Sequence, residues 1–85
     1  PPEIYLLSLH DALPIFQGRR IDVAIDDGCH ADPAILSTLR SVIPHLADNF
    51  IYFIEDNRSV YNTIQHLYPE FSVENQGEFT VLSPR

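Results

Sequence analysis

The chain has no lysine: its five basic residues are arginines, against twelve acidic residues, and its formal net charge is −7. Proteins that bind nucleic acid or anionic membranes use basic surfaces, so this balance argues against both kinds of partner. A single cysteine cannot form an internal disulfide, which makes a reducing compartment the default. No apolar run approaches the roughly 20 residues of a bilayer-spanning helix. We therefore expect a small soluble protein of one domain at most, located in the cytoplasm.

The residues that are present alternate between strand and helix patterns. The run "RRIDVAID" (residues 19–26) has the β-branched composition of a buried strand. Asp32 and Pro33 then favour a helix start, with Asp32 as the N-cap, and apolar residues follow at helical spacing as far as Leu46. "FIYFI" (residues 50–54) lacks alternation, which is typical of a strand covered on both faces.

A turn, a second helix and a hairpin complete the pattern. Asp48 and Asn49 favour a turn before the second strand, with Asn49 in the left-handed conformation. Ser59 can cap the second helix. The runs "FSVEN" and "EFTVL" alternate on either side of Gln76 and Gly77, which predicts an antiparallel hairpin.

These elements predict an α/β protein that contains a βαβ unit. Two strands joined by a crossover helix should lie parallel in one sheet, with a right-handed connection. The residues that follow both strands should then share one edge of the sheet. Open α/β sheets bind their ligands at that edge, outside the carboxyl ends of the strands.

Acidic residues follow both of the predicted parallel strands. Asp26 and Asp27 end the first strand, and His30 comes three residues later. Glu55 and Asp56 end the second strand. Carboxylates this close repel one another unless a cation lies between them, and carboxylate oxygens are ligands that Mg²⁺ prefers. Because imidazole titrates near neutral pH, His30 could act as a general base beside such a cation.

Each of these residues also has a purely structural interpretation. Acids at strand ends often cap loops, which is our expectation for Asp26. A solvated edge explains the other acids as well as a site does, and a lone loop histidine such as His30 is usually a surface residue. Cys29 is expected to fill the loop, since no Lys or Arg adjoins it in the sequence. The aromatic residues of "FIYFI" are expected in the core.

The segments "IDVAIDDGCH" and "FIYFIEDN", with a helix between them, resemble the second half of class I S-adenosylmethionine-dependent methyltransferases. They are similar in particular to macrolide sugar O-methyltransferases and cephalosporin-hydroxylase-like enzymes, which carry "IDDGSH" and "YVIEDL" and end in a hairpin. The resemblance covers residues 20–83 and implies the C-terminal half of a Rossmann-like methyltransferase sheet. In metal-dependent members it implies that Asp27, Glu55 and Asp56 hold Mg²⁺. It also implies His30 as the base.

The resemblance further implies a fragment of an O-methyltransferase that acts on a hydroxyl of a sugar or another small molecule. His30 would remove the hydroxyl proton as the methyl group leaves S-adenosylmethionine, while Mg²⁺ lowers the pKa of the hydroxyl. Family members hold this cofactor with a glycine-rich loop, whereas the three glycines here form no G-x-G cluster. We therefore expect the fragment to be inactive alone. Two departures are Cys29, in place of the usual Ser, and "LADNF", in place of a Pro-Gly-Gly turn.

Two other classes of protein also place acids at strand ends. One is a phosphate-handling doubly wound domain, such as a receiver or an acid phosphatase-like fold. Such domains usually need a Lys after a later strand, and the phosphatases need an Asp-x-Asp nucleophile, neither of which this chain contains. The other is a non-catalytic α/β interaction module whose acids only solvate an edge, and this alternative stays open. The sequence leaves the oligomeric state open as well.

The segment "EIYLLSLHDALPI" (residues 3–15) resembles the translation of a common short-read sequencing adapter. It matches that translation at every position except Leu6. We therefore interpret residues 1–15 as a non-native, adapter-derived segment, to be left out of fold reasoning. Residues 16–85 remain as the C-terminal part of a methyltransferase domain.

Overall fold

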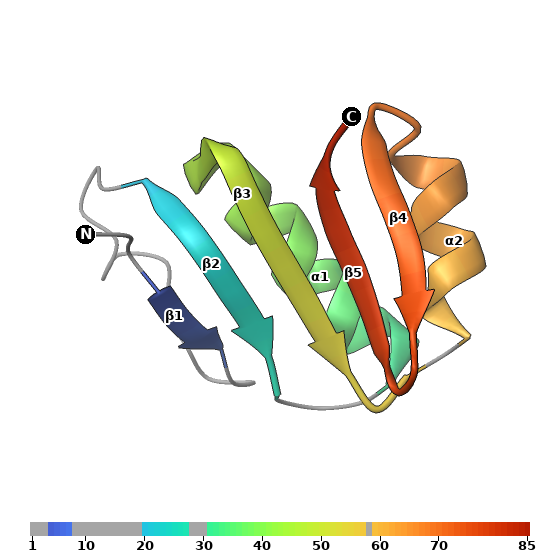
Figure 1. Ribbon diagram of the computed structural model, residues 1–85. Helices are drawn as coiled ribbons and strands as arrows, with labels where there is room; N and C mark the ends of the chain where they lie inside the picture. The colour runs from blue at the N-terminus through green and yellow to red at the C-terminus, as the bar shows by residue number, and fades with distance from the viewer. Residues whose placement is uncertain (1–3, 8–19, 28–30, 58) are drawn as a thin grey trace.

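One mixed β-sheet organises the chain (Figure 1). The computed structural model describes residues 4–7, 20–27, 31–57 and 59–85. The strands are β1 (Ile4–Leu7), β2 (Ile21–Asp26), β3 (Leu46–Glu55), β4 (Phe71–Gln76) and β5 (Phe79–Pro84). The helices are α1 (Asp32–Val42) and α2 (Val60–Leu67), with a 3₁₀ turn η2 (Ile43–His45) after α1. The strand order is β1-β2-β3-β5-β4, so the predicted α/β class is confirmed.

β2 and β3 are parallel neighbours, as the predicted βαβ unit requires. The chain leaves β2, forms α1 and returns through β3, so both strands run in the same direction (Figure 1). Their register places Asp26 opposite Ile54. The carboxyl ends of β2 and β3 therefore meet at one edge of the sheet, at the bottom of Figure 1.

The predicted C-terminal hairpin is present, and its second strand enters the sheet. β5 pairs antiparallel with both β3 and β4, so it lies between them and leaves β4 outermost. The connection is Gly77-Glu78, one residue later than the sequence predicts. Gly77 has φ +63°, and a glycine with positive φ at this first central position is what a type II′ turn requires.

The start of β3 differs from the sequence-based expectation. Asp48 and Asn49 lie within β3 and form no turn, and Asn49 does not have a positive φ. Ile21 pairs with Leu46, whereas Val23 already pairs with Ile51, so β3 carries extra residues relative to β2. A bulge absorbs such residues in extended backbone, which explains why no reverse turn is needed here.

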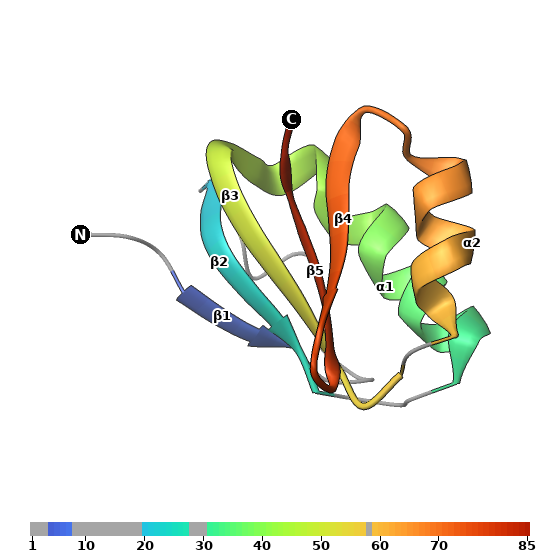
Figure 2. The ribbon, with the colours of Figure 1, turned by 45° about the vertical axis from the view of Figure 1, so that its right-hand side comes forward.

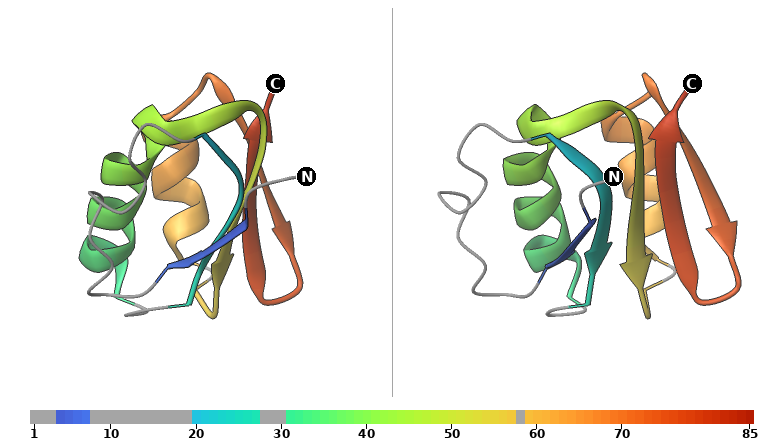
Figure 3. Two further views of the ribbon diagram at one scale, coloured as in Figure 1. Left: turned by 90° about the vertical axis from the view of Figure 1, so that its left-hand side faces the viewer. Right: turned by 60° about the vertical axis from the view of Figure 1, so that its left-hand side comes forward.

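Both helices pack against the same face of the sheet (Figures 2 and 3). The core lies between that face and the helices. Its fully buried apolar side chains are Ile21, Ala24, Tyr52, Ile54 and Leu82 from the sheet and Ile35, Leu39, Val42, Val60 and Ile64 from the helices. Neither α1 nor α2, in the part of the chain that the structure describes, is long and apolar enough to cross a membrane.

In the part of the chain that the structure describes, no helix lies on the opposite face of the sheet. For these residues, the prediction that "FIYFI" is covered on both faces is therefore wrong. Phe50, Tyr52 and Ile54 point into the core, but Ile51 is 40% exposed. Phe79 is 37% exposed, and its ring contacts that of the half-buried Phe53 at 5.8 Å between centroids. The alternation of side chains along β3 thus separates a covered face from an open apolar one.

β1 adds a parallel strand at the open edge of β2, with Ile4 opposite Val23 and Leu7 opposite Asp26. The unpaired N–H and C=O groups of a strand edge are a template for any extended segment that lies alongside. The pairing therefore shows that the β2 edge accepts a further strand. It does not bear on the adapter interpretation, and the rest of residues 1–15 lies outside the described residues.

Candidate functional site

The three predicted metal ligands lie at the carboxyl edge of the sheet. Asp27 follows β2 directly, and Glu55 ends β3 with Asp56 after it. Because Asp26 pairs with Ile54, Asp27 and Glu55 come next on two adjacent strands. Asp27 and Asp56 are exposed, and Glu55 is half-buried. The structure thus brings the three backbone positions together as the spacing predicts.

The fourth predicted site residue, His30, lies outside the described residues, as do Gly28 and Cys29. Among the residues that are described, no three His, Cys, Asp or Glu side chains gather closely enough to hold a metal ion. Mg²⁺ commonly keeps several waters and takes only one or two protein carboxylates. The structure does not gather Asp27, Glu55 and Asp56 into a metal-binding group, and the binding of Mg²⁺ stays a prediction.

Asp56 has an unusual backbone conformation. Its φ is +59°, the left-handed region, which no other non-glycine residue of the described segments adopts. Asp and Asn enter this region more readily than most residues, because their short polar side chains can form local hydrogen bonds. The Asp56 N–H donates to the Glu78 carbonyl at 3.1 Å, so the β4–β5 turn holds this bend at the end of β3.

Asp32 does not cap α1, contrary to the prediction from sequence. The N-cap position is Ala31, and no side chain caps this helix. The Asp32 carboxylate instead accepts hydrogen bonds from the segment that follows β3: Asn57 Nδ2 donates to Oδ1 at 2.6 Å, and Ser59 Oγ lies 3.0 and 3.2 Å from Oδ1 and Oδ2. Asp32 thus pairs with Asn57, which lies 25 positions later in the sequence, and with Ser59, which lies 27 positions later, instead of capping its own helix.

Ser59 does not cap α2 either, although it precedes the helix. No cap hydrogen bond forms from its side chain, and its backbone is already helical. Asn57 Oδ1 accepts the Val60 N–H at 3.0 Å and thereby satisfies one amide at the start of α2. Ser59 Oγ also lies 2.9 Å from Asn57 Oδ1. Since one hydroxyl carries one proton, Ser59 donates to Asp32 or to Asn57 at any moment.

Asp26 is buried, and its expected role as a loop cap stays a prediction, because residues 28–30 of that loop lie outside the described residues. Only 4% of it is exposed, and it lies two residues after the buried Ala24 on the same side of β2. Burial raises the pKa of the Tyr52 hydroxyl, and the nearby charge of Asp26 raises it further. The Tyr52 hydroxyl has no hydrogen-bond partner among the described residues. The period-two pattern of β2 was the sequence signal that could have indicated a buried Asp26.

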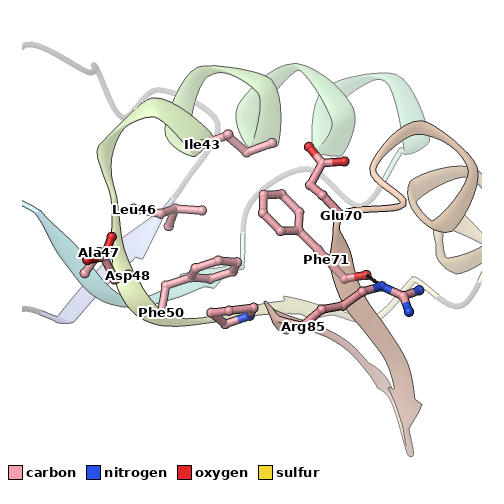
Figure 4. Close-up of a pocket in the computed structure, with 9 residues that line it drawn as sticks. Ile43, Leu46, Ala47, Asp48, Phe50, Glu70, Phe71 and Arg85 are labelled. Carbon is pink, nitrogen blue, oxygen red and sulfur yellow. Dashed lines mark hydrogen bonds between the residues drawn. The ribbon is translucent and has the colours of Figure 1, made fainter.

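A hollow of about 370 Å³ lies at the opposite end of the sheet (Figure 4). The rings of Phe50 and Phe71 meet edge to face on its floor, with centroids 5.2 Å apart. Asp48, Glu70 and Arg85 line it as well, and Arg85 Nε donates to the Phe71 carbonyl at 3.2 Å. It therefore lies away from the acidic edge and shares no residue with the predicted site.

The fold and the edge together define an α/β protein whose parallel βαβ unit brings acidic residues to the carboxyl edge of the sheet. Comparison with protein-family models, curated proteins and solved structures finds no match to this chain.

Proposed function

We propose that residues 16–85 are the C-terminal part of a cytoplasmic S-adenosylmethionine-dependent O-methyltransferase that acts on a hydroxyl of a sugar or another small molecule. The parallel pairing of β2 and β3, with Asp26 opposite Ile54, carries this proposal. It brings Asp27, with which the "DDGCH" segment leaves β2, and the "EDN" segment to the same edge, where open α/β sheets bind ligands. The hairpin beside β3 supports it further, since the resembling enzymes end in one.

The proposed roles follow the chemistry of each side chain. Asp27, Glu55 and Asp56 would hold Mg²⁺, which when bound would stabilise negative charge on the acceptor oxygen. His30 would take the proton of the acceptor hydroxyl as the methyl group is transferred in line. The resembling enzymes hold S-adenosylmethionine with a glycine-rich loop, which the three glycines of this chain do not form, so residues 16–85 alone would be inactive.

The role of His30 is tested in the complete enzyme by His30→Ala. Loss of a general base should lower kcat by about 10²–10⁴-fold. Binding of S-adenosylmethionine, measured by calorimetry, should not change. His66→Ala is the control, because His66 is exposed on α2 and distant in sequence from the acidic edge. Unchanged turnover in His30→Ala would remove the proposed base.

The metal is tested by titrating the intact protein with Mg²⁺. A saturable site that Asp27→Asn weakens, and that Asp48→Asn leaves unchanged, supports the proposal. Asp48 is a suitable control because it is an exposed acid at the other end of β3. A non-catalytic interaction module would show no saturable site. Upstream sequence gives a further test, since a strand and a glycine-rich loop should lie about 60–90 residues before Phe16.

A further inference from the structure

We propose that Asp32, Asn57 and Ser59 form a positioning lock that fixes the segment after β3 against the start of α1. The hydrogen bonds from Asn57 Nδ2 and Ser59 Oγ to the Asp32 carboxylate span 2.6 to 3.2 Å. These bonds connect Asp32 to residues that lie 25 and 27 positions later in the sequence. Asp32 is the first residue of α1, and Asn57 and Ser59 follow β3, so the lock fixes the segment after β3 relative to the start of α1.

The lock lies beside the residues of the proposed site. Asp32 begins α1, immediately after the connection that contains Asp27 and His30. Asn57 follows Glu55 and Asp56 without an intervening residue. The bond between Asp32 and Asn57 therefore joins the end of one candidate segment to the end of the other. The link between the lock and a ligand rests on the proposed function, because that function requires the residues after β2 and those after β3 to bind the same ligand.

The segment after β3 is held on its other side by the hairpin. The Asp56 N–H donates to the Glu78 carbonyl at 3.1 Å. Thr80 is fully buried, and its Oγ1 lies 3.4 Å from the Asn57 carbonyl. Asp56, with its left-handed φ of +59°, thus lies between its own backbone contact to the hairpin and the side-chain contact that its neighbour Asn57 makes to α1. Loss of the Asp32 contact frees one of these two sides.

Asp32 acts as a positioning residue and is no metal ligand. Asn57 Nδ2 donates to Oδ1, and Ser59 Oγ lies within hydrogen-bond distance of both carboxylate oxygens, so both of these donors are neutral. The partners Asn57 and Ser59 are not proposed ligands, so loss of Asp32 should weaken metal affinity less than the about 10–100-fold typical for partners that bond a ligand directly. The proposed function assigns the ion to Asp27, Glu55 and Asp56, of which Asp27 and Asp56 are exposed.

The lock itself is tested by backbone amide exchange in the 85-residue chain. In the wild type, the Asp56 and Val60 amides should exchange slowly, because each has a hydrogen-bond acceptor. Asp32→Ala should speed exchange at Asp56 at least tenfold, and Asp48→Ala should not. Equal exchange at Asp56 in the wild type and in Asp32→Ala overturns the lock. So does a wild-type chain whose Asp56 amide exchanges as fast as that of an unstructured peptide.

Its connection to the proposed site is tested by Mn²⁺ titration, with Mn²⁺ replacing Mg²⁺ as a paramagnetic probe. Asp32→Ala should weaken Mn²⁺ binding by up to about 10-fold, the lower end of the range for partners that bond a ligand directly. Asp32→Asn should restore most of it, because the amide oxygen still accepts from Asn57 and the amide nitrogen can donate to Ser59 Oγ. Equal weakening in both variants would show an effect of charge alone and overturn positioning. If the wild type binds no Mn²⁺, the metal has no part in the proposed function. The amide-exchange experiment then tests by itself whether the lock exists.

Discussion

Asn57 Nδ2 donates a hydrogen bond of 2.6 Å to Asp32 Oδ1, which joins the segment after β3 to the first residue of α1. The sequence assigns Asp32 to a different task, capping its own helix, and assigns no task to Asn57. In the structure Asn57 instead accepts the Val60 N–H at the start of α2. One asparagine thus stabilises the start of α2 and fixes α2 relative to α1, which makes it a sensitive position for stability.

Asn57→Ala is expected to reduce the free energy of unfolding by about 1–2 kcal/mol, since it removes the acceptor for Val60 and the donor to Asp32. Ser59→Ala should reduce it by only about 0.5–1 kcal/mol, because it removes one hydroxyl proton and no helix cap. Urea unfolding measures both. Ser72→Ala, a half-buried serine in β4, is the control for the loss of a hydroxyl. A Ser59→Ala variant less stable than Asn57→Ala would contradict this assignment of the cap.

Asp56→Gly is expected to leave stability unchanged or to raise it, because glycine adopts φ near +60° without a side-chain penalty. Asp56→Ala should be less stable than Asp56→Gly by about 1–2 kcal/mol, the cost of the left-handed region for a residue with a Cβ. Thermal or urea unfolding of the two variants gives the difference. The order should reverse for Asp48→Gly and Asp48→Ala, since Asp48 lies in extended backbone. Equal stabilities at position 56 would argue against the left-handed conformation.

Tyr52→Phe is expected to raise stability by about 1 kcal/mol, because the buried hydroxyl has no partner among the described residues. It should also remove an alkaline loss of stability. Tyrosine in the unfolded chain releases its proton near pH 10.0, whereas burial, with the charge of Asp26, raises the pKa of Tyr52 when folded. The unfolded state therefore binds fewer protons above pH 10, so the free energy of unfolding falls by up to about 1.4 kcal/mol per pH unit there. Below pH 10 this contribution is constant.

Unfolding in urea from pH 8 to 11 measures this slope. The chain has no lysine, so the usual competing titration near pH 10 is missing. Tyr61→Phe, at a half-buried position of α2, is the control and should keep the alkaline loss. The same loss above pH 10 in Tyr52→Phe would show that Tyr52 is not its origin.

Ile54→Ala and Ile51→Ala compare the two faces of β3. Ile54 is fully buried against the helices, so Ile54→Ala should reduce the free energy of unfolding by about 2–5 kcal/mol. Ile51 is 40% exposed on the helix-free face, so Ile51→Ala should cost less than about 1 kcal/mol. Ile51→Thr should also raise the solubility of the 85-residue chain, since it reduces an exposed apolar face. Chemical unfolding and precipitation measurements test these outcomes.

A large loss of stability in Ile51→Ala would show that another part of the chain covers this face. Unchanged solubility in Ile51→Thr would show that the open face does not drive association. Phe79→Ser repeats the solubility test on β5, where the side chain is 37% exposed.

The sequence by itself determined the order of the elements and the parallel pairing of β2 and β3. Both follow from short-range patterns: β-branched runs, helical spacing and the length of a crossover connection. The same patterns placed Asp27, Glu55 and Asp56 at one edge, because parallel strands end on the same side. The 3₁₀ turn and the early start of β3 were missed, since a bulge leaves the local composition unchanged.

Only the tertiary structure decided what the polar side chains at that edge do. Asp32 and Ser59 have the residue types of helix caps, yet their partners lie across the sheet edge. Asp26 is buried near Tyr52, which its position at a strand end does not specify. A cap is a local interaction that competes with any donor or acceptor brought close by folding, and a sequence does not specify which long-range partner will be within 3 Å. The elements are therefore local, whereas the hydrogen bonds that arrange them are not.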